Sequence, residues 1–172
     1  MVHRRRRIRR FGRRRLTGRQ VAAAVAACGL LALAAHHGSA TAGQAKASAV
    51  STAAAATAIA YASAQLGKPY VYGATGPGAF DCSGLVQAAW ASAGVSIPRT
   101  SEEQWAQLPH VSSPQPGDLV FYIGSPIDPP PGHVTLYIGG GQMIEAYGTG
   151  YPIREVPIRP DVVGYAQPWG GA

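Results

Sequence analysis

The sequence predicts one α+β domain, with helices in its first half and an antiparallel sheet in its second half. From Ser51 to the short helix that opens at Thr100–Glu103, the chain shows helix signals, namely apolar residues at helical spacing, capping residues, and glycine or proline at helix ends. From Asp118 onward the pattern changes to the two-residue alternation that is typical of strands. Helices followed by strands, rather than alternating with them, indicate an α+β fold.

Three helices are predicted, each from its own local signals. The first covers Ser51 to Gly67, is rich in alanine, and ends at Gly67 and Pro69, which stop helices. Asp81 is a favourable N-cap residue, so the second helix runs from Cys82 to about Ala93. The third helix is short and opens at Thr100–Glu103, which matches a capping box.

Three strands follow, and a fourth is a candidate. The alternating segments are Asp118–Ile123, His133–Ile138 and Gln142–Tyr147, and Tyr151–Ile158 is the candidate. In the second of these segments the apolar residues share one face and the polar residues share the other, as expected for a strand with one side against a core.

The N-terminal residues have the composition of a secretory leader. Ten of the fifteen Lys and Arg residues lie between Arg4 and Arg19, and an uncharged apolar run from Val21 to Ala35 follows them. The small residues Ala40–Ala42 suit cleavage by a signal peptidase. The apolar run is shorter than the ~20 residues of a membrane-spanning helix. We therefore expect a signal peptide that is removed, with no stable membrane insertion afterwards.

This division predicts a signal peptide at residues 1–42, a linker at 43–50 and the folded domain at 51–172. Residues 20–172 contain five basic and eight acidic residues, a formal charge of −3, whereas the whole chain has +7. The basic charge therefore belongs to the leader, and we expect no binding of nucleic acid. The expected location is secreted, extracellular or in the cell wall, and the expected state is a monomer.

Cys82 is the only cysteine after the leader, and its surroundings suit a nucleophile. It is placed at the start of a predicted helix, a glycine-rich segment precedes it, and a histidine follows later in the chain. The polar neighbours Asp81 and Ser83 argue against an apolar core position. A buried structural cysteine is the alternative, and the thiol alone leaves both interpretations open.

The strands that contain His133 and Glu145 offer the partners that a thiol nucleophile needs. A three-residue loop at Gly139–Gly141 would pair Ile138 with Gln142 and place His133 and Glu145 on one face, roughly 7 Å apart along the diagonal. A two-residue turn would put them on opposite faces. A histidine that is oriented by a carboxylate and faces a thiol is the arrangement of nucleophilic catalysis. A partly exposed histidine at a strand start is the alternative.

Six segments in order along the chain resemble the signature blocks of the NlpC-type cell-wall peptidases. They are Gly67–Gly73, Phe80–Leu85, Pro98–Ser101 with Gln104, Gly117–Phe121, His133–Gly139 and Met143–Ala146. Members of this family are papain-like cysteine hydrolases that cut peptidoglycan stem peptides, commonly between D-γ-glutamate and the diamino acid. The resemblance implies a papain-like core, with N-terminal helices packed on an antiparallel sheet, and makes residues 51–172 an NlpC-type catalytic domain.

The resemblance also implies roles for the three candidate catalytic residues. Cys82 would be the nucleophile and His133 the base. Glu145 would be the third polar residue, at a position that relatives also fill with His, Asn or Gln. A helix N-terminus and a neighbouring imidazolium would both favour the thiolate form of Cys82.

Three further residues match positions at which relatives contact the substrate. Tyr70 matches a tyrosine near the oxyanion site, and Asp81 and Ser83 match residues that meet a free amine of the substrate. The proline-rich insertion at residues 125–132 departs from the family pattern. Asp118 is expected to serve a turn or a strand start, without a catalytic role.

Together these inferences predict a secreted peptidoglycan endopeptidase that hydrolyses stem-peptide amide bonds by a Cys-His-Glu mechanism, without a metal or other cofactor. The expected partners are peptidoglycan stem peptides. Two alternatives stay open: a Cys-His amidase or transferase that acts on another cell-wall amide, and a non-catalytic wall-binding protein. Retention of Cys82, His133 and Glu145 together argues against the binding protein.

Overall fold

A computed structural model of the chain describes residues 52–124 and 131–169. The predicted signal peptide and linker, and most of the proline-rich insertion, lie outside these described residues. Among the helices that are described, none combines the length and the apolar character needed to cross a bilayer.

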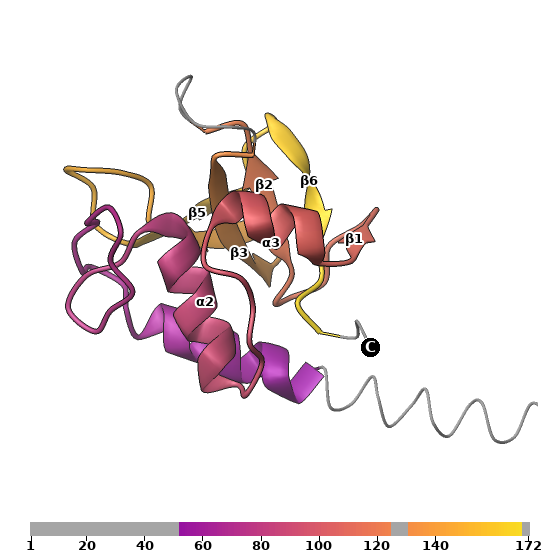
Figure 1. Ribbon diagram of the computed structural model, residues 1–172, viewed down its shortest axis with the longest axis horizontal. Coiled ribbons are helices and arrows are strands. Elements are labelled where there is room, and N and C mark those ends of the chain that lie inside the picture. The colour runs from indigo at the N-terminus through magenta and orange to yellow at the C-terminus, as the bar shows by residue number, and fades with distance from the viewer. Residues whose placement is uncertain (1–51, 125–130, 170–172) are drawn as a thin grey trace, which may run out of the picture. The chain divides into compact units, whose positions relative to one another are not determined.

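Within these segments three helices come first, and a six-stranded antiparallel sheet follows (Figure 1). The elements are a helix over residues 52–63, α2 (Cys82–Ser92), α3 (Ser101–Gln107), β1 (His110–Val111), β2 (Leu119–Tyr122), β3 (His133–Gly139), β4 (Gln142–Glu145), β5 (Arg154–Pro157) and β6 (Val162–Ala166). The α+β class is therefore confirmed.

The helix boundaries follow from the capping residues. Asp81 caps α2 by accepting a hydrogen bond from the backbone N–H of Gly84 at 2.6 Å, and Thr100 forms the predicted capping box with Glu103 at the start of α3. The first helix was predicted to reach Gly67 but ends at residue 63, and residues 64–67 form turns. There the N–H of Gly67 donates to the carbonyl of Ile153, so the chain leaves the helix to meet the segment before β5.

The sheet contains two strands that the sequence pattern does not reveal. Its order is β1-β6-β2-β3-β4-β5, so the last strand of the chain lies inside the sheet, between β1 and β2. Strand β6 is short and Gly164 interrupts its pattern. A Cβ atom at Gly164 would lie 2.6 Å from the ring of Trp105, so the indole packs on this strand only because glycine is there.

The turn between β3 and β4 differs from the predicted one, and so does the predicted pairing of Ile138 with Gln142; from Tyr137 and Met143 onward the register is the predicted one. The turn has two residues, Gly140 and Gly141, and Gly139 pairs with Gln142. A register shift between Tyr137 and Gly139 then restores the pairing of Tyr137 with Met143. The register shift leaves one extra residue, Ile138, on β3, and this compensates for the turn being one residue shorter than predicted. His133 and Glu145 therefore stay on one face of the sheet.

The main core lies between the helices and one face of the sheet. Figure 1 shows the helices gathered on one side of the sheet, and α2 packs against β3. Val134 and Leu136 of β3 face this core, where Trp90 of α2 is fully buried. On the other face Val120, Tyr122 and Met143 form a smaller buried cluster. By strand alternation, His133 and Glu145 belong to this second face.

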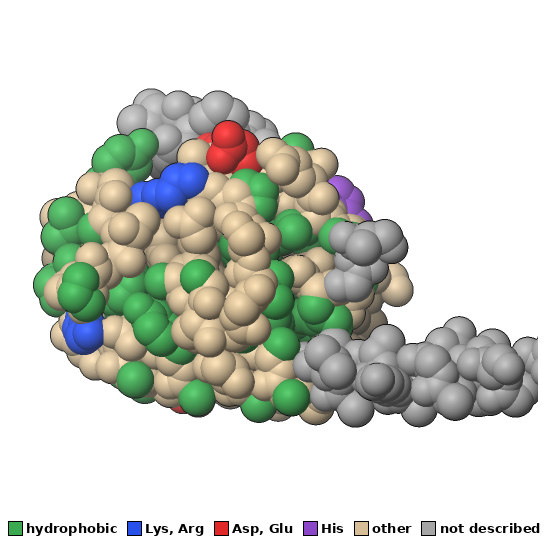
Figure 2. Space-filling model, turned by 60° about the horizontal axis from the view of Figure 1, so that its bottom comes forward, with side chains coloured by type: hydrophobic (Ala, Val, Ile, Leu, Met, Phe, Trp, Pro, Cys, Tyr) green, Lys and Arg blue, Asp and Glu red, His purple; other side chains and the backbone are tan. Residues whose placement is uncertain are grey.

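Charged side chains are few on the face of the molecule that Figure 2 shows, where apolar side chains are scattered among polar atoms. Of the four basic residues that the structure describes, three are arginines that form ion pairs: Arg99 with Asp81, and Arg154 and Arg159 with Glu145. The arginines of the domain are therefore engaged in ion pairs around two buried carboxylates.

Candidate active site

The side chains of Cys82 and His133 meet where the N-terminus of α2 reaches the end of the sheet. Cys82 is the first residue of α2 and His133 is the first residue of β3. The thiol is free and partly exposed, and Cys82 and His133 line the same cavity, where the interaction with Cys82 helps to raise the pKa of His133. The predicted thiol and histidine are thus brought together.

Glu145 completes this arrangement from the neighbouring strand. It is the last residue of β4, and its Oε2 lies 3.3 Å from Nε2 of His133. Because Nε2 is engaged with the carboxylate, Nδ1 is the ring nitrogen that remains for the sulfur of Cys82. The order thiol, imidazole, carboxylate is the one expected from the sequence.

Two arginines, which the sequence analysis did not include in the site, hold the Glu145 carboxylate. Arg154 donates from Nε and Nη2 to Oε1 at 3.1 and 2.8 Å, and Arg159 donates from Nη1 to Oε2 at 2.7 Å. Glu145 is fully buried. Burial alone would raise its pKa, but the hydrogen bonds with His133 and both arginines outweigh burial and lower the pKa to about 2. The carboxylate is therefore ionised at neutral pH.

The same carboxylate acts on the imidazole. Burial alone would lower the pKa of His133, but hydrogen bonds and charge interactions with Cys82 and Glu145 outweigh burial, and the pKa lies above its ordinary value. His133 therefore holds its proton to a higher pH than an exposed histidine does.

Tyr122 and Tyr147 enclose the histidine and support the arginines. Tyr122 pairs directly with His133 across the β2–β3 ladder, and its hydroxyl accepts a hydrogen bond from the backbone N–H of Arg159 at 3.3 Å. Its ring lies 4.1 Å from the guanidinium carbon of Arg159, a cation–π contact. The ring of Tyr147 meets His133 edge to face with centroids 5.8 Å apart. The imidazole is therefore packed as well as hydrogen-bonded.

At the start of α2, the Asp81 carboxylate has protein partners on both oxygens. It accepts from the backbone N–H groups of Gly73 and Gly84, and Arg99 donates to it from Nη1 at 3.1 Å and Nη2 at 2.5 Å. Ser83 shares the same arginine, since its Oγ accepts from Nη1 of Arg99 at 2.8 Å. Both residues were predicted to meet a substrate amine, and the structure shows them engaged with Arg99.

Position 84 has no space for a side chain, which explains why this motif has glycine there. A Cβ atom there would lie 2.3 Å from the carbonyl oxygen of Ala74 and 2.8 Å from Oδ1 of Asp81. Only glycine lets the loop before α2 close on the first turn of the helix. The backbone around Cys82 is therefore fixed by the Asp81 cap and by this close contact.

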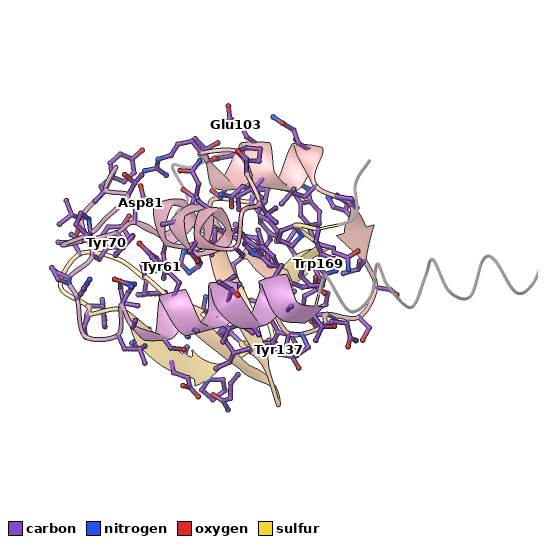
Figure 3. The ribbon with its side chains drawn as sticks, turned by 90° about the horizontal axis from the view of Figure 1, so that it is seen from below. Tyr61, Tyr70, Asp81, Glu103, Tyr137 and Trp169 are labelled. Carbon is purple, nitrogen blue, oxygen red and sulfur yellow. The ribbon has the colours of Figure 1, made fainter. Side chains whose placement is uncertain are left out.

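A cleft runs past Cys82 and has two parts, both lined by Tyr70, Cys82 and Gly132. The first part, of about 350 Å³, is also lined by His133, Tyr122, Tyr147, Arg159 and Asp161. The second part, of about 410 Å³, is also lined by Asp81, Ser83, Arg99 and residues 100–102. We call them the histidine-side cavity and the helix-side cavity. Figure 3 shows Tyr70 and Asp81 on the same side of the domain, beside the loops that precede α2.

This arrangement suits attack on a carbonyl group. The thiol lies in the cleft at a helix start, where the first N–H groups have no partner within the helix and can stabilise negative charge. The imidazole beside it can accept and return a proton. In the described segments no group of three or more His, Cys, Asp or Glu side chains is placed to hold a metal ion.

Comparison with known proteins places this site in a family. The profile of the NlpC/P60 family matches residues 67–163. The probable endopeptidase p60 of Listeria monocytogenes is 48% identical over 95 residues, which are 54% of this chain and 19% of that protein. A probable endopeptidase of Corynebacterium glutamicum is 46% identical over 97 residues, 55% of this chain and 44% of that protein. The chain thus spans about a fifth of the length of the p60 proteins it matches.

Solved structures agree with these matches. The peptidoglycan hydrolase RipB from Mycobacterium tuberculosis superposes with a TM-score of 0.58 and 37% identity, over 68% of this chain and 65% of that one. The P60 domain of an antigen from M. avium subspecies paratuberculosis gives a TM-score of 0.59 and 34% identity, over 67% of this chain and 94% of that one. NlpC/P60 domains have the papain-like fold, so the predicted fold is confirmed.

Proposed function

Because this chain belongs to the NlpC/P60 family, we propose that it is a peptidoglycan hydrolase, a cysteine peptidase that cuts amide bonds in stem peptides. The observation that carries the proposal is the arrangement of three side chains: Cys82 and His133 line one cavity of the cleft, and His133 is hydrogen-bonded to the buried carboxylate of Glu145. A structural cysteine would have no need of a histidine, or of a carboxylate held by two arginines. The names of the relatives, endopeptidase and peptidoglycan hydrolase, agree with this chemistry.

In the proposed reaction the Cys82 thiolate attacks the carbonyl carbon of the scissile amide, and a tetrahedral intermediate forms. Backbone N–H groups at the start of α2 and the hydroxyl of Tyr70 stabilise its oxyanion. His133 gives its proton to the leaving nitrogen, the C–N bond breaks, and an acyl-enzyme remains. His133 then takes a proton from water, the hydroxide attacks the thioester, and the thiolate is regenerated.

Glu145 is a positioning residue in this scheme. Its Oε2 fixes the imidazole through Nε2, so that Nδ1 faces the sulfur, and its charge stabilises the imidazolium that forms during the reaction. Arg154 and Arg159 keep the carboxylate ionised and immobile. The two arginines therefore act on the imidazole only through the Glu145 carboxylate.

The proposed bond is the one between D-γ-glutamate and the diamino acid of the stem peptide. The proposed location is outside the cell, in the cell wall, after removal of the leader, and the proposed state is a monomer. A peptide substrate extends on both sides of the amide bond that is cut. The two parts of the cleft at Cys82 provide space for these two sides of the substrate.

Digestion of defined muropeptides, followed by mass spectrometry of the products, tests the proposal. The protein should release fragments cut at the D-γ-glutamyl bond, and Cys82→Ala should release none while keeping the melting temperature of the wild type. Fragments cut only between muramic acid and alanine would reassign the protein as an amidase, and no cleavage with reduced thiol would favour a wall-binding protein.

A further inference from the structure

The two parts of the cleft can be assigned to the two sides of the scissile bond. His133 must give its proton to the leaving nitrogen, so the leaving part of the substrate occupies the part of the cleft that His133 lines. That part is the histidine-side cavity. The acyl part then lies in the helix-side cavity, which Asp81 and Arg99 line and His133 does not. This assignment rests on the proposed function.

Besides Cys82 and His133, the described residues that line the histidine-side cavity include a cation and an anion side by side. Nε of Arg159 lies 3.7 Å from Oδ1 of Asp161, and both residues line the cavity. The Asp161 side chain is 64% exposed and that of Arg159 is 29% exposed, so both are accessible to a ligand. A guanidinium has five N–H donors, and the contacts of Arg159 with described residues engage only Nη1 and Nε. No described residue accepts from the Nη2 hydrogens, and these are the donors that we assign to a substrate.

Arg159 differs in this respect from the other two arginines of the site. Arg99 has both terminal nitrogens on Asp81 and lines the helix-side cavity. Arg154 holds Glu145 as Arg159 does, but it is not among the residues that line the histidine-side cavity. Among the described arginines, only Arg159 both contacts the Glu145 carboxylate and lines the cavity assigned to the leaving group.

We propose that the histidine-side cavity recognises a zwitterionic amino-acid end on the leaving residue, with the carboxylate bound by Arg159 and the ammonium bound by Asp161. The carboxylate and the ammonium of such an end are bonded to the same carbon and therefore lie close together. This spacing matches the guanidinium of Arg159 and the carboxylate of Asp161, which lie side by side. Arginine suits the carboxylate because its planar donors fit two oxygens at once. A diamino acid with two carboxyl groups carries this end on its side chain, as long as the side-chain amine is free.

The proposal has a consequence for the substrate. Cross-linking acylates the side-chain amine of the diamino acid and removes its positive charge, so Asp161 loses its partner. The enzyme should therefore prefer stem peptides that are not cross-linked. Amidation of the side-chain carboxylate removes the negative charge, so Arg159 loses its partner. Peptides that carry this amide should therefore also be cut more slowly.

Steady-state kinetics on three matched peptides test the proposal. The peptides contain D-γ-glutamyl-diaminopimelate with a free side-chain end, with that end amidated at the carboxylate, or with that end acetylated at the amine. For the wild type, kcat/KM should fall about 10- to 100-fold with either modification, the range for loss of a charge-assisted hydrogen bond. Arg159→Gln should abolish the discrimination against the amide only, and Asp161→Asn the discrimination against the acetyl group only.

Arg154→Gln is the matched control, because it also weakens the hold on Glu145 but does not line the cavity. It should lower kcat/KM on all three peptides by one common factor and leave their ratios unchanged. Arg159→Lys keeps the charge and should keep part of the discrimination if the glutamine variant does not fold. Each variant is compared with the wild type by thermal unfolding.

Equal rates of the wild type on the three peptides would overturn the inference and leave the proposed function intact. Discrimination against one modification only, or ratios that survive in the Arg159 and Asp161 variants, would also overturn it. Failure to cleave any of the peptides at the glutamyl bond would overturn both proposals.

Discussion

Arg154 lies directly opposite Glu145 in the β4–β5 ladder, and its guanidinium donates from Nε and Nη2 to one carboxylate oxygen, Oε1. The other oxygen, Oε2, is shared by Arg159 and His133. The carboxylate that orients the histidine is therefore itself held by two cations. Removal of one partner from a buried ion pair leaves a charge without its counterpart, and this is more costly than the net value of the pair.

Glu145→Gln should destabilise the fold at neutral pH, because it leaves Arg154 and Arg159 beside a neutral amide. The pKa of Glu145 falls from 4.5 to about 2 in the folded protein, which corresponds to about 3 kcal/mol of stability at pH 7 as an upper estimate. A lowered pKa stabilises the fold above the unfolded value of 4.5, and this contribution is lost as the pH falls toward 2.

Urea unfolding of the wild type and Glu145→Gln between pH 7 and pH 3 measures this dependence. The difference in the free energy of unfolding should shrink on acidification. Glu155→Gln is the control, since Glu155 is an exposed carboxylate on β5 and should show no such difference. A difference between wild type and Glu145→Gln that is constant with pH would show that the charge of Glu145 does not stabilise the fold.

Activity should separate the roles of His133 and Glu145. His133→Ala removes the proton carrier and should lower kcat/KM by roughly 10²- to 10⁴-fold. Glu145→Gln should lose less, because the amide still accepts a hydrogen bond from the imidazole. It should also move the alkaline limb of the pH–rate profile to lower pH, because the Glu145 charge raises the pKa of His133. Equal small losses and an unchanged pH profile would mean that His133 is structural.

The pairing of His133 with Glu145 could be predicted because the strand register fixes which side chains share a face. The prediction assumed a three-residue loop, and the structure reaches the same register by a two-residue turn with a strand irregularity before it. The alternation of side chains along the two paired strands was therefore enough to place His133 and Glu145 on one face, whereas the length of the turn was predicted wrongly. Asp81 as a cap and the capping box at Thr100 were predictable for a similar reason, since each depends on residues within one helical turn.

The arginines could not be assigned in the same way. The position of Arg154 depends on the register of β5 against β4, and the sequence indicated β5 only as a candidate strand. Arg159 follows β5 outside any strand, so no periodicity places it. Strand β6 was missed because Gly164, which makes room for Trp105, weakens the strand pattern. In each case the decisive contact depends on where β5, the segment after it, or β6 lies in the sheet, and the sequence pattern did not establish these positions.

Asp118 should make the stability of the fold depend on pH in the direction opposite to Glu145. It is 1% exposed, Oδ2 accepts from the backbone N–H of Gln115 at 2.6 Å, and Oδ1 has no partner among the described residues. Burial, opposed by that hydrogen bond, raises its pKa to about 6. A raised pKa stabilises the fold fully below the unfolded value of 3.8, and this contribution is lost as the pH rises through 6.

Melting temperatures of the wild type and Asp118→Asn from pH 4 to pH 7.5 test this expectation. The asparagine keeps an oxygen for the N–H of Gln115 but cannot ionise, so the variant should lose less stability than the wild type as the pH rises. Glu155→Gln again serves as control and should follow the wild type. Parallel curves for the wild type and Asp118→Asn would show that the Asp118 carboxyl has the same pKa in the folded and unfolded chains.

Asp81→Asn should lower stability although asparagine also caps helices, because the ion pair with Arg99 is lost. Asp81 is 6% exposed and receives hydrogen bonds from two backbone N–H groups as well as from Arg99. Since Arg99 is partly exposed, we expect a loss of about 1 kcal/mol. Arg99→Gln should cost a similar amount, and the double variant should lose less than the sum of the two if the pair is the common cause. Additive losses would show that the two residues act separately.

The same variants test whether Asp81 also meets a substrate amine, as the family resemblance predicts. Short stem peptides with a free N-terminal alanine should then be cut faster than acetylated ones. Asp81→Asn should shrink this difference, because the anion is gone. Arg99→Gln should enlarge it, because the competing cation is gone and the carboxylate is free to bind the amine. Cleavage rates of free and acetylated peptides by the three proteins give the answer. If both peptides are cut at equal rates by the wild type and by Arg99→Gln, Asp81 serves only as the cap of α2 and the partner of Arg99.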